Sequence, residues 1–484
     1  MTPRPAAALA VLLATSVPAR AAAGDWKCSA KGGREWRELS TEHFRVATDL
    51  SSGAAKDLAV ELETMHAAVR GALFRTPPPM PGLVRVVAFR SEEDYRAFAP
   101  DEVDAYFAIS DGRPTVVMHG EFAEYTRIVV AHELGHQLLA RVFPRQPRWF
   151  SEGLACYLET VGLNGPDATP TVGGVPPHRH RTVYPYHGGI GEVLRARDGL
   201  ADHRQYGLAW ALVHYLIQAR GAEFGQFQAR LGKGEDPAAA WLAVFPKWDP
   251  ASEAGMEDLD REVGHHVAGG RFAYRTVTLQ KDHAVSERPL PPAEVHALRA
   301  RLPAIGAARS EGRAAAEFKE ALAEDPVQLE GLRFLAEARG ADGKALARKA
   351  VEAHPGSERA WLLAARFADD AAATEKALRR AVELAPDDVE SLVELAWFLV
   401  RAEREGEALP HARKAAFLAP WSAPVLDTYA GALQGLGQCP EALATERRAV
   451  DVLSEHASME ERMPYYERLS ALVTSCGPKP AAKP

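Results

Sequence analysis

The sequence predicts an α+β domain followed by an all-α solenoid of helical repeats. Between residues 34 and 118 short extended segments alternate with amphipathic helical segments, which is the pattern of an α+β fold. Beyond residue 286 the composition changes to Ala, Leu, Glu and Arg, and a short phrase ending in proline recurs, which indicates a repeat array. With 484 residues, 47% of them hydrophobic, the chain has enough apolar material for two or three packed domains.

The chain starts with an apolar run of the kind found in secretory signal peptides. Arg4 precedes apolar residues 6–17, and small residues follow up to Ala23. The run is too short to span a bilayer, and no other stretch is long and apolar enough to do so. We therefore expect residues 1–23 to be a signal peptide and the mature protein to be periplasmic or extracellular, with no membrane span. The alternative is an Ala-rich tail on a cytosolic protein.

The formal net charge of -8 at pH 7 argues against a nucleic-acid partner. Residues 1–23 carry Arg4 and Arg20 and no acidic residue, so removing two positive charges from -8 leaves -10. The chain has four cysteines, too few for a fold built on disulfides. The composition is therefore that of an ordinary globular protein.

The expected α+β domain covers residues 24–285. Its predicted elements are strands at residues 43–48, 83–89, 105–109 and 114–118, and helices at residues 54–73, 91–98, 207–217, 231–250 and 252–267.

A further helix, over residues 129–139, carries the motif on which the functional prediction rests. Apolar residues at helical spacing surround His132, Glu133 and His136. Residues four apart share one face of a helix, so the two imidazoles can bind one Zn²⁺ ion. Glu133 is one step round the helix, where its carboxylate can reach a water on the metal and act as a general base.

A catalytic zinc site needs a third protein ligand, and we expect Glu152 to supply it. Pro144 and Pro147 end the first helix, so the chain turns and can bring a second helix, over residues 149–159, back beside it. Ser151 is a candidate N-cap of that helix.

These residues resemble the gluzincin metallopeptidases, and in particular the peptidase MA-like domains. The likeness rests on the sequence HELGH, which starts at His132, and on the following PRWFSEGLA, which includes Glu152. The resemblance implies a zincin-like fold in which Zn²⁺ is bound by His132, His136 and Glu152. It also implies that Glu133 activates the attacking water.

The resemblance extends to a helix that begins near Tyr206. In the aminopeptidase N branch such a tyrosine steadies the oxyanion of the tetrahedral intermediate, which implies the same role for Tyr206. A hydrogen-bonded structural tyrosine is the alternative. No Gly-x-Met-Glu-Asn-type segment precedes the zinc helix, so an endopeptidase is favoured over an aminopeptidase. Thermolysin-like enzymes have an acidic residue four positions after the third ligand, where this chain has Cys156. Glu159, one turn further along the same face, is a candidate for orienting a zinc-binding histidine in its place.

Three further features are assigned no chemistry of their own. His178 and His180 lie in a stretch rich in proline and glycine, which we interpret as a solvated loop or part of the cleft rim. We expect His214, on the helix over residues 207–217, to be packed in the core of the domain. The resemblance implies that Thr115–His119 is the strand to which a substrate adds, and an ordinary paired strand is the alternative.

The repeat array is predicted at residues 286–476, after a proline cluster at residues 288–292. The prolines that close its phrase are 29, 31 and 34 residues apart, at Pro326, Pro355, Pro386 and Pro420. This period resembles the tetratricopeptide repeat, in which paired helices approach closely at small residues and bury an apolar face by stacking. An unrelated helical bundle is the alternative. Residues 477–484 are expected to be a disordered tail.

Cysteine positions suggest one disulfide within the repeats. Cys439 and Cys476 fall near corresponding places in neighbouring helical units, so we expect them to pair. Cys28 and Cys156 are expected to be free thiols.

These patterns predict an exported zinc metallopeptidase. Zinc lowers the pKa of a bound water toward about 7, Glu133 takes its proton, and the resulting hydroxide attacks a peptide carbonyl. The expected partners are a peptide or protein substrate and a protein bound by the repeats. One alternative is an adaptor or assembly factor of the cell envelope with a non-catalytic zincin domain. Another is a chaperone-like assembly factor that also cleaves misfolded clients.

Overall fold

The computed structural model divides into two compact units, each assembled from separate pieces of the chain. The first comprises Met1–Asp57, Pro81–Glu121 and Val285–Pro484, and the second comprises Leu58–Met80 and Phe122–Ala284. We expected one domain over residues 24–285, whereas the structure places parts of that range in both units.

The residues that the structure describes are 27–73, 83–99, 103–110, 113–120, 124–162, 170–196, 200–270, 272, 275–277, 283–302, 312–453 and 457–476. The predicted signal peptide and the predicted tail lie outside these residues.

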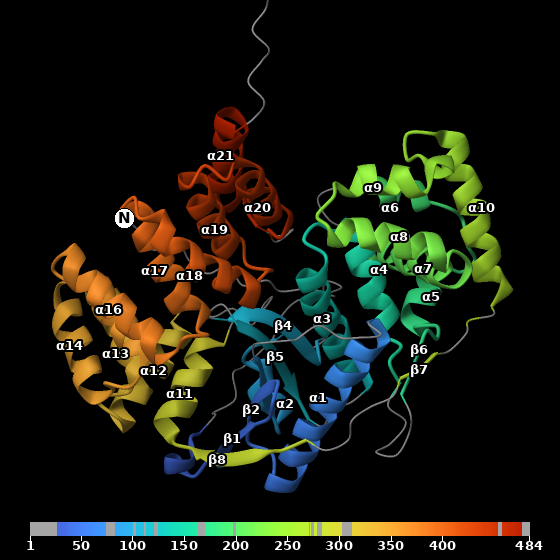
Figure 1. Ribbon diagram of the computed structural model, residues 1–484. Coiled ribbons are helices and arrows are strands. Elements are labelled where there is room, and N and C mark those ends of the chain that lie inside the picture. The colour runs from blue at the N-terminus through green and yellow to red at the C-terminus, as the bar shows by residue number, and fades with distance from the viewer. Residues whose placement is uncertain are drawn as a thin grey trace, which may run out of the picture. The chain divides into compact units, whose positions relative to one another are not determined.

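A six-stranded mixed sheet is the centre of the first unit (Figure 1). Its strands are β1 (Trp36–Ser40), β2 (Phe44–Thr48), β3 (Val84–Phe89), β4 (Ala105–Ser110), β5 (Arg113–His119) and β8 (Ser286–Leu290), in the order β4-β5-β3-β2-β1-β8. β3 pairs in parallel with β2 and β5, and the other neighbours are antiparallel. The four predicted strands agree with β2 to β5 to within a residue. The predicted helix after β3 is α2 (Glu92–Arg96), capped by Ser91.

β8 is formed by the proline-rich stretch that we expected to separate two domains. It pairs antiparallel with β1, so that Leu290 lies opposite Trp36. Proline is accepted in this strand because β8 is at the edge of the sheet, where a missing N–H leaves no neighbouring strand unpaired. An ion pair of 2.9 Å between Arg37 and Glu287 joins the two strands. The stretch therefore completes the sheet and is not a linker.

β5 corrects the prediction that Thr115–His119 receives a substrate strand. β5 is paired along both sides, with β4 on one and β3 on the other. Its backbone hydrogen-bonding groups are therefore used within the sheet, and no added strand can pair with it. The ordinary paired strand, which was the alternative, is what the structure contains.

The rest of the first unit is a series of helices that lie beside one another in chain order (Figure 1). They are α11 (Pro292–Arg301), α12 (Arg313–Glu324), α13 (Leu329–Arg339), α14 (Gly343–Ala353), α15 (Glu358–Arg366), α16 (Ala371–Leu384), α17 (Val389–Arg401), α18 (Glu405–Leu418), α19 (Ala423–Gly435), α20 (Cys439–Asp451) and α21 (Met459–Cys476). Each proline of the recurring phrase comes two residues after a helix, at the ends of α12, α14, α16 and α18. Proline cannot continue a helix, so it fixes the turn between successive helix pairs.

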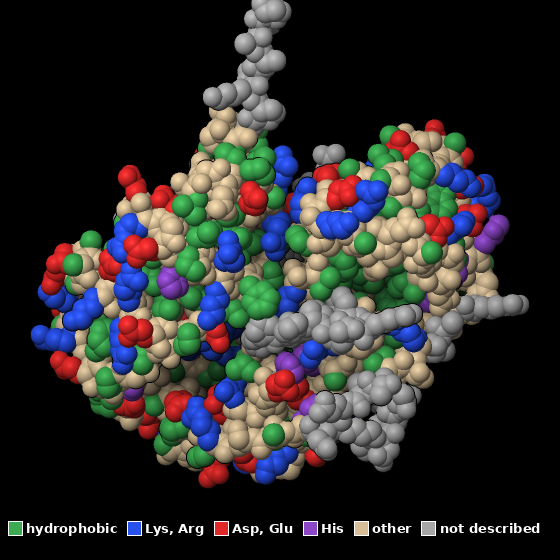
Figure 2. Space-filling model, in the orientation of Figure 1, with side chains coloured by type: hydrophobic (Ala, Val, Ile, Leu, Met, Phe, Trp, Pro, Cys, Tyr) green, Lys and Arg blue, Asp and Glu red, His purple; other side chains and the backbone are tan. Residues whose placement is uncertain are grey.

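Alanines let the paired helices approach closely. Six of them in the last helices of the array are fully buried, namely Ala396, Ala408, Ala415, Ala430, Ala442 and Ala449. Successive apolar clusters run along the array and share residues such as Val382 and Tyr429, as expected of units that bury a face only by stacking. Cys439 and Cys476 form a disulfide, as predicted, and Cys28 and Cys156 are free. The chain therefore ends in a helical-repeat region, on whose visible surface acidic and basic side chains are interspersed (Figure 2).

The second unit is mainly helical. Its elements are α1 (Ser52–Leu73), which enters from the first unit, α3 (Glu124–Val142), α4 (Arg148–Leu158), α5 (Pro177–Val183), α6 (Ile190–Arg195), α7 (His203–Ala219), α8 (Gly221–Gly232), α9 (Pro237–Val244), α10 (Glu253–Gly269) and the strand pair β6 (Thr171–Val172) and β7 (Arg275–Thr276). The helix predicted at residues 231–250 is the shorter α9, which Asp236 caps just before Pro237. Among the described residues, every helix is too short or too polar to cross a membrane.

Two glycines let α4 pack between α3 and α7. A Cβ atom on Gly135 of α3 would lie 2.7 Å from the Leu158 side chain, and one on Gly153 of α4 would lie 2.5 Å from the Ala209 carbonyl oxygen. Both distances are below ordinary van der Waals contact. A side chain at Gly153 would push α4 away from the α7 backbone, and one at Gly135 would force the Leu158 side chain to move. Trp149 of α4 stacks on Phe227 of α8 with ring centroids 5.7 Å apart. α4 is therefore fixed closely between its neighbours.

His214 of α7 is a buried core histidine, as expected. Its Nε2–H donates to the Gly173 carbonyl at 3.0 Å, so its Nδ1 accepts a hydrogen from His266 Nε2, 2.9 Å away. A second proton on His214 would place two N–H groups against each other. Burial lowers the pKa of His214 to about 4.

We predict that His214 makes the fold acid-sensitive. A histidine whose pKa is lower in the folded state keeps its stabilising contribution above the unfolded pKa of about 6.5 and loses it as the pH falls toward 4. The difference between the two pKa values corresponds to a loss of about 3 kcal/mol in the free energy of unfolding at the acidic end. Urea unfolding of the metal-free protein at several pH values should show a smaller acid loss for His214→Gln than for the wild type. Parallel pH curves would contradict this explanation.

Candidate metal centre

Three predicted ligand atoms converge in the second unit. His132 and His136, one turn apart on α3, bring their Nε2 atoms to 3.0 Å from each other. Glu152 on α4 places Oε2 at 3.4 Å from each of these nitrogens. His132 and Glu152 are only 6% and 7% exposed. The two motifs that are separate in the sequence therefore form one group of donors, in which His136 is half-buried and the other two are buried.

The spacing of these donors fits a divalent metal ion. Ligands about 2.0–2.1 Å from a tetrahedral Zn²⁺ lie about 3.3–3.4 Å from one another, close to the separations found here. His132 Nδ1 lies 2.8 Å from Glu159 Oε1, and a carboxylate only accepts, so this nitrogen carries the ring proton. In this tautomer His132 Nε2 carries a lone pair, which points toward Glu152 and His136. A cation among these atoms, a metal ion or a proton, would offset the repulsion between their lone pairs.

Hydrogen bonds hold both rings in the ligand orientation. Glu159 follows the last residue of α4 and meets His132, as the sequence suggested. His136 Nδ1 lies 2.9 Å from the Ser151 hydroxyl. Ser151 was expected to cap α4, but Pro147 is at the cap position and Ser151 is one turn inside the helix. The structure therefore places Ser151 beside a predicted ligand and not at the helix end.

A second group of potential ligands shares His132 but is less suited to a metal. It contains His132, Cys156 and Glu159, with donor atoms within 4.8 Å of one another. Glu159 already accepts from His132 and from the guanidinium of Arg179, and burial raises the pKa of the Cys156 thiol. A neutral thiol and a carboxylate paired with arginine are poor ligands, so we assign the metal to the group with Glu152.

Glu133 lies beside the donors but is not one of them. It follows His132 on α3, is 5% exposed and is absent from the ligand groups found among the described residues. Burial raises the pKa of Glu133, although the nearby histidines oppose this. By contrast, the burial that would raise the pKa of Glu152 is outweighed by His136 and His132, which hold it well below its usual range. The two carboxyl groups are therefore suited to different roles, Glu152 to ligation and Glu133 to proton transfer.

The interpretation of residues 176–181 as a solvated loop was wrong. They begin the helix α5, with Pro177 in its first turn. Arg179 is buried and donates to both carboxylate oxygens of Glu159, at 2.7 and 3.1 Å, while exposed His178 contacts Glu159 at 2.9 Å. Burial would raise the pKa of Glu159, but His132, His178 and Arg179 keep it below its usual range. Sequence reasoning missed Arg179, although the proline at a possible helix start was a usable signal.

Tyr206 lies further from the ligand atoms than Arg179 does, in the first turn of α7. Its ring is partly buried and packs against Arg179, whose guanidinium carbon is 5.2 Å from the ring centroid. Arg179 therefore stands between Tyr206 and the Glu159–His132 pair. The role of the Tyr206 hydroxyl in oxyanion stabilisation stays a prediction.

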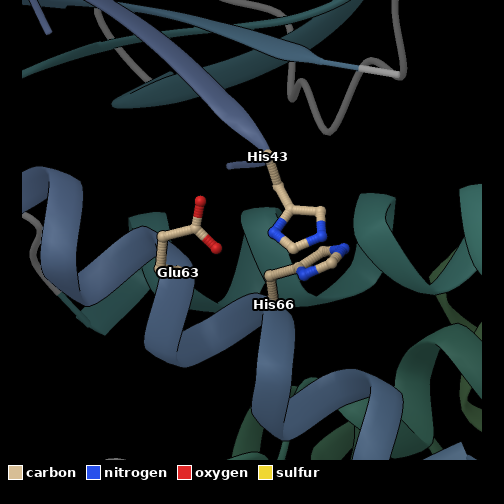
Figure 3. A group of neighbouring side chains, drawn as sticks. All are labelled: His43, Glu63 and His66. Atoms are coloured by element: carbon tan, nitrogen blue, oxygen red, sulfur yellow. The ribbon is translucent and has the colours of Figure 1, made fainter. Parts of the chain in front are cut away.

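Two other buried ionisable side chains lie on α1. Glu63 and His66 are three residues apart and leave the helix on the same side (Figure 3). His43, which the figure also labels, precedes β2 and belongs to the first unit. None of these residues was among the predicted ligands, and the Glu63–His66 pair shares no residue with the site on α3 and α4.

Comparisons with known proteins find one family and several repeat structures. Residues 127–235, which include all five predicted site residues, match the model of a family described as a protein of unknown function, DUF1570. No curated protein matches the chain.

Three solved structures illustrate the similarity to repeat proteins. MamA is 20% identical over 29% of this chain and 80% of its own, with a TM-score of 0.24. TTC0263, a thermophilic TPR protein of Thermus thermophilus, is 17% identical over 34% and 90%, with a TM-score of 0.27. Yeast Tom70 is 13% identical over 74% and 76%, with a TM-score of 0.31. At these low TM-scores, the repeat assignment depends on the helices of this chain.

We predict that Glu152, and not Cys156, is needed for metal binding. Glu152→Ala removes an anionic donor and should abolish stoichiometric zinc, whereas Cys156→Ala removes a thiol outside the ligand set and should leave the stoichiometry unchanged. Metal content of the purified variants, measured after dialysis against a weak chelator, checks both. Zinc lost from the Cys156 variant and kept by the Glu152 variant would assign the metal to the other group.

Proposed function

We propose that this protein is a zinc-dependent peptidase of the gluzincin type. The observation that carries the proposal is the convergence of His132 Nε2, His136 Nε2 and Glu152 Oε2, with Glu133 next to them and outside the ligand set. A purely structural zinc site has no need of the fourth side chain here, the non-ligating carboxylate of Glu133. A zincin-like arrangement of the second unit and cleavage by an endopeptidase mechanism belong to the same proposal.

The side chains of the site divide the chemistry among them. Bound Zn²⁺ would supply Lewis acidity toward water and the scissile carbonyl. Glu133 takes the proton of the attacking water and returns it to the departing amine. Glu159 holds the His132 ring in place, and Ser151 holds that of His136. The Tyr206 hydroxyl donates to the developing oxyanion.

The repeats and the site serve different steps in this proposal. The stacked helices of the first unit bind protein substrates or partners, which extended helical arrays do through their large surfaces. The protein acts after export, outside the cytoplasm. The second candidate function is a repeat adaptor of the cell envelope, favoured by the length of the helical array, with a zinc site that performs no hydrolysis.

Glu133→Gln separates the two candidate functions. Glutamine has almost the same shape but cannot accept the proton of water, so this variant should retain stoichiometric zinc and lose all detectable peptide cleavage. A fluorogenic peptide library and metal analysis of both proteins provide the measurements. Unchanged cleavage would refute the role of Glu133, and zinc without activity in the wild type on any peptide would favour the adaptor.

Tyr206→Phe tests the oxyanion role. Phenylalanine keeps an aromatic ring against Arg179 and removes only the hydroxyl, so zinc content should not change. Loss of one oxyanion donor typically costs about 10²-fold or more in kcat, and we expect a fall of that order with little change in KM. A kcat within about twofold of the wild type would make Tyr206 a structural residue.

A further inference from the structure

Arg179 is joined to the candidate metal centre through a single carboxylate. Its Nη2 lies 2.7 Å from Glu159 Oε1 and its Nε 3.1 Å from Oε2, so the guanidinium meets the carboxylate as a two-pronged fork. Glu159 Oε1 is also the atom that faces His132 Nδ1 at 2.8 Å. Arg179 is 4% exposed and Glu159 is 7% exposed. The chain of contacts therefore runs from α5, through the end of α4, to a ligand on α3.

The fork fixes the direction in which Glu159 points. A carboxylate bound at one oxygen can rotate about its last bond, whereas one bound at both oxygens cannot turn without breaking a bond to arginine. Held in this way, Glu159 presents Oε1 to His132 and keeps the ring proton on Nδ1, which leaves Nε2 as the donor atom. Arg179 also neutralises Glu159, which together with Glu133 is an acidic group buried beside the ligands.

A second contact fixes Arg179 itself. Tyr206, which is on α7, lies against the Arg179 guanidinium, with 5.2 Å between the guanidinium carbon and the ring centroid. Thr182, whose hydroxyl lies beside Gly207, donates a hydrogen bond to the Arg179 carbonyl. A Cβ atom on Gly207 would lie only 3.0 Å from the same carbonyl oxygen, so α5 leaves no room for a side chain there. α5 is therefore seated on α7, and its arginine has little freedom to move.

We propose that Arg179 is a positioning residue that sets the zinc affinity of this site by locking Glu159 onto His132. The inference rests on the proposed zinc site and adds to it a residue from a third helix that lies outside the ligand set. Its function is to hold the His132 ring in the tautomer and orientation that bind a metal ion.

Zinc affinity, measured by competition with a chromophoric chelator, tests this without reference to catalysis. Outer hydrogen-bond partners of zinc ligands typically contribute about 10–100-fold in affinity, so Arg179→Met should weaken binding by about tenfold or more. Arg179→Lys keeps a charge but not the fork and should recover only part of the loss. Arg181→Met, on the exposed side of the same helix, is the matched control and should bind zinc as the wild type does.

A double-mutant cycle shows whether Arg179 acts through Glu159. If it does, Glu159→Ala, which removes both acceptor oxygens, already removes the effect, and Glu159→Ala with Arg179→Met should bind zinc within about twofold of Glu159→Ala alone. Losses that multiply would show that Arg179 acts by another route and would overturn the inference. Melting of the metal-free variants controls for folding. If Arg179→Met does not fold, the same cycle is run with Arg179→Lys.

The outcomes distinguish this inference from the function on which it rests. A wild-type protein that binds zinc, together with an Arg179→Met variant that binds it equally well, would overturn the positioning role and leave the peptidase proposal intact. A wild-type protein that binds no zinc would overturn both.

Discussion

The close packing of α3 against α4 is the constraint on which the candidate metal centre depends. The donor atoms come from both helices, and the 3.4 Å separations between Glu152 and the two histidines exist only if the helices are near each other and in one register. Gly135 makes that approach possible, because a Cβ atom there would overlap the Leu158 side chain of α4, and Gly153 lets α4 pack against α7 on its other side. These glycines, each within one of the two zinc motifs, are therefore needed for the geometry of the site and not for its chemistry.

Polar groups around the site are satisfied in successive layers. Burying a carboxylate or an imidazole is costly unless each polar atom has a partner. His132 meets Glu159, Glu159 meets Arg179, and Arg179 lies on the Tyr206 ring. Each of these groups offsets the free-energy cost of burying the polar group that it contacts. The last contact in the series is with an aromatic ring. The site is rigid for this reason before any ligand is considered.

The sequence predicted those parts of the structure that depend on local spacing. His132 and His136 share a face because of helical periodicity, and the repeats follow from the prolines and buried alanines. Arg179 was missed because its partner Glu159 is 20 residues away, across a turn that no local pattern specifies. β8 was missed because its pairing with β1 joins residues about 250 positions apart, as the contact between Arg37 and Glu287 illustrates. Only the folded chain reveals such long-range partners.

The position of β8 determines where this protein can be divided. A fragment ending at residue 285 would contain both zinc motifs and would look complete in the sequence, yet it would lack an outer strand of the sheet. The backbone of β1 would then lose its partner, and Trp36 would lose Leu290, which belongs to the same apolar cluster. A strand whose backbone is unpaired along one side can pair with another chain. Cloning boundaries for a shortened version should therefore retain residues 286–290.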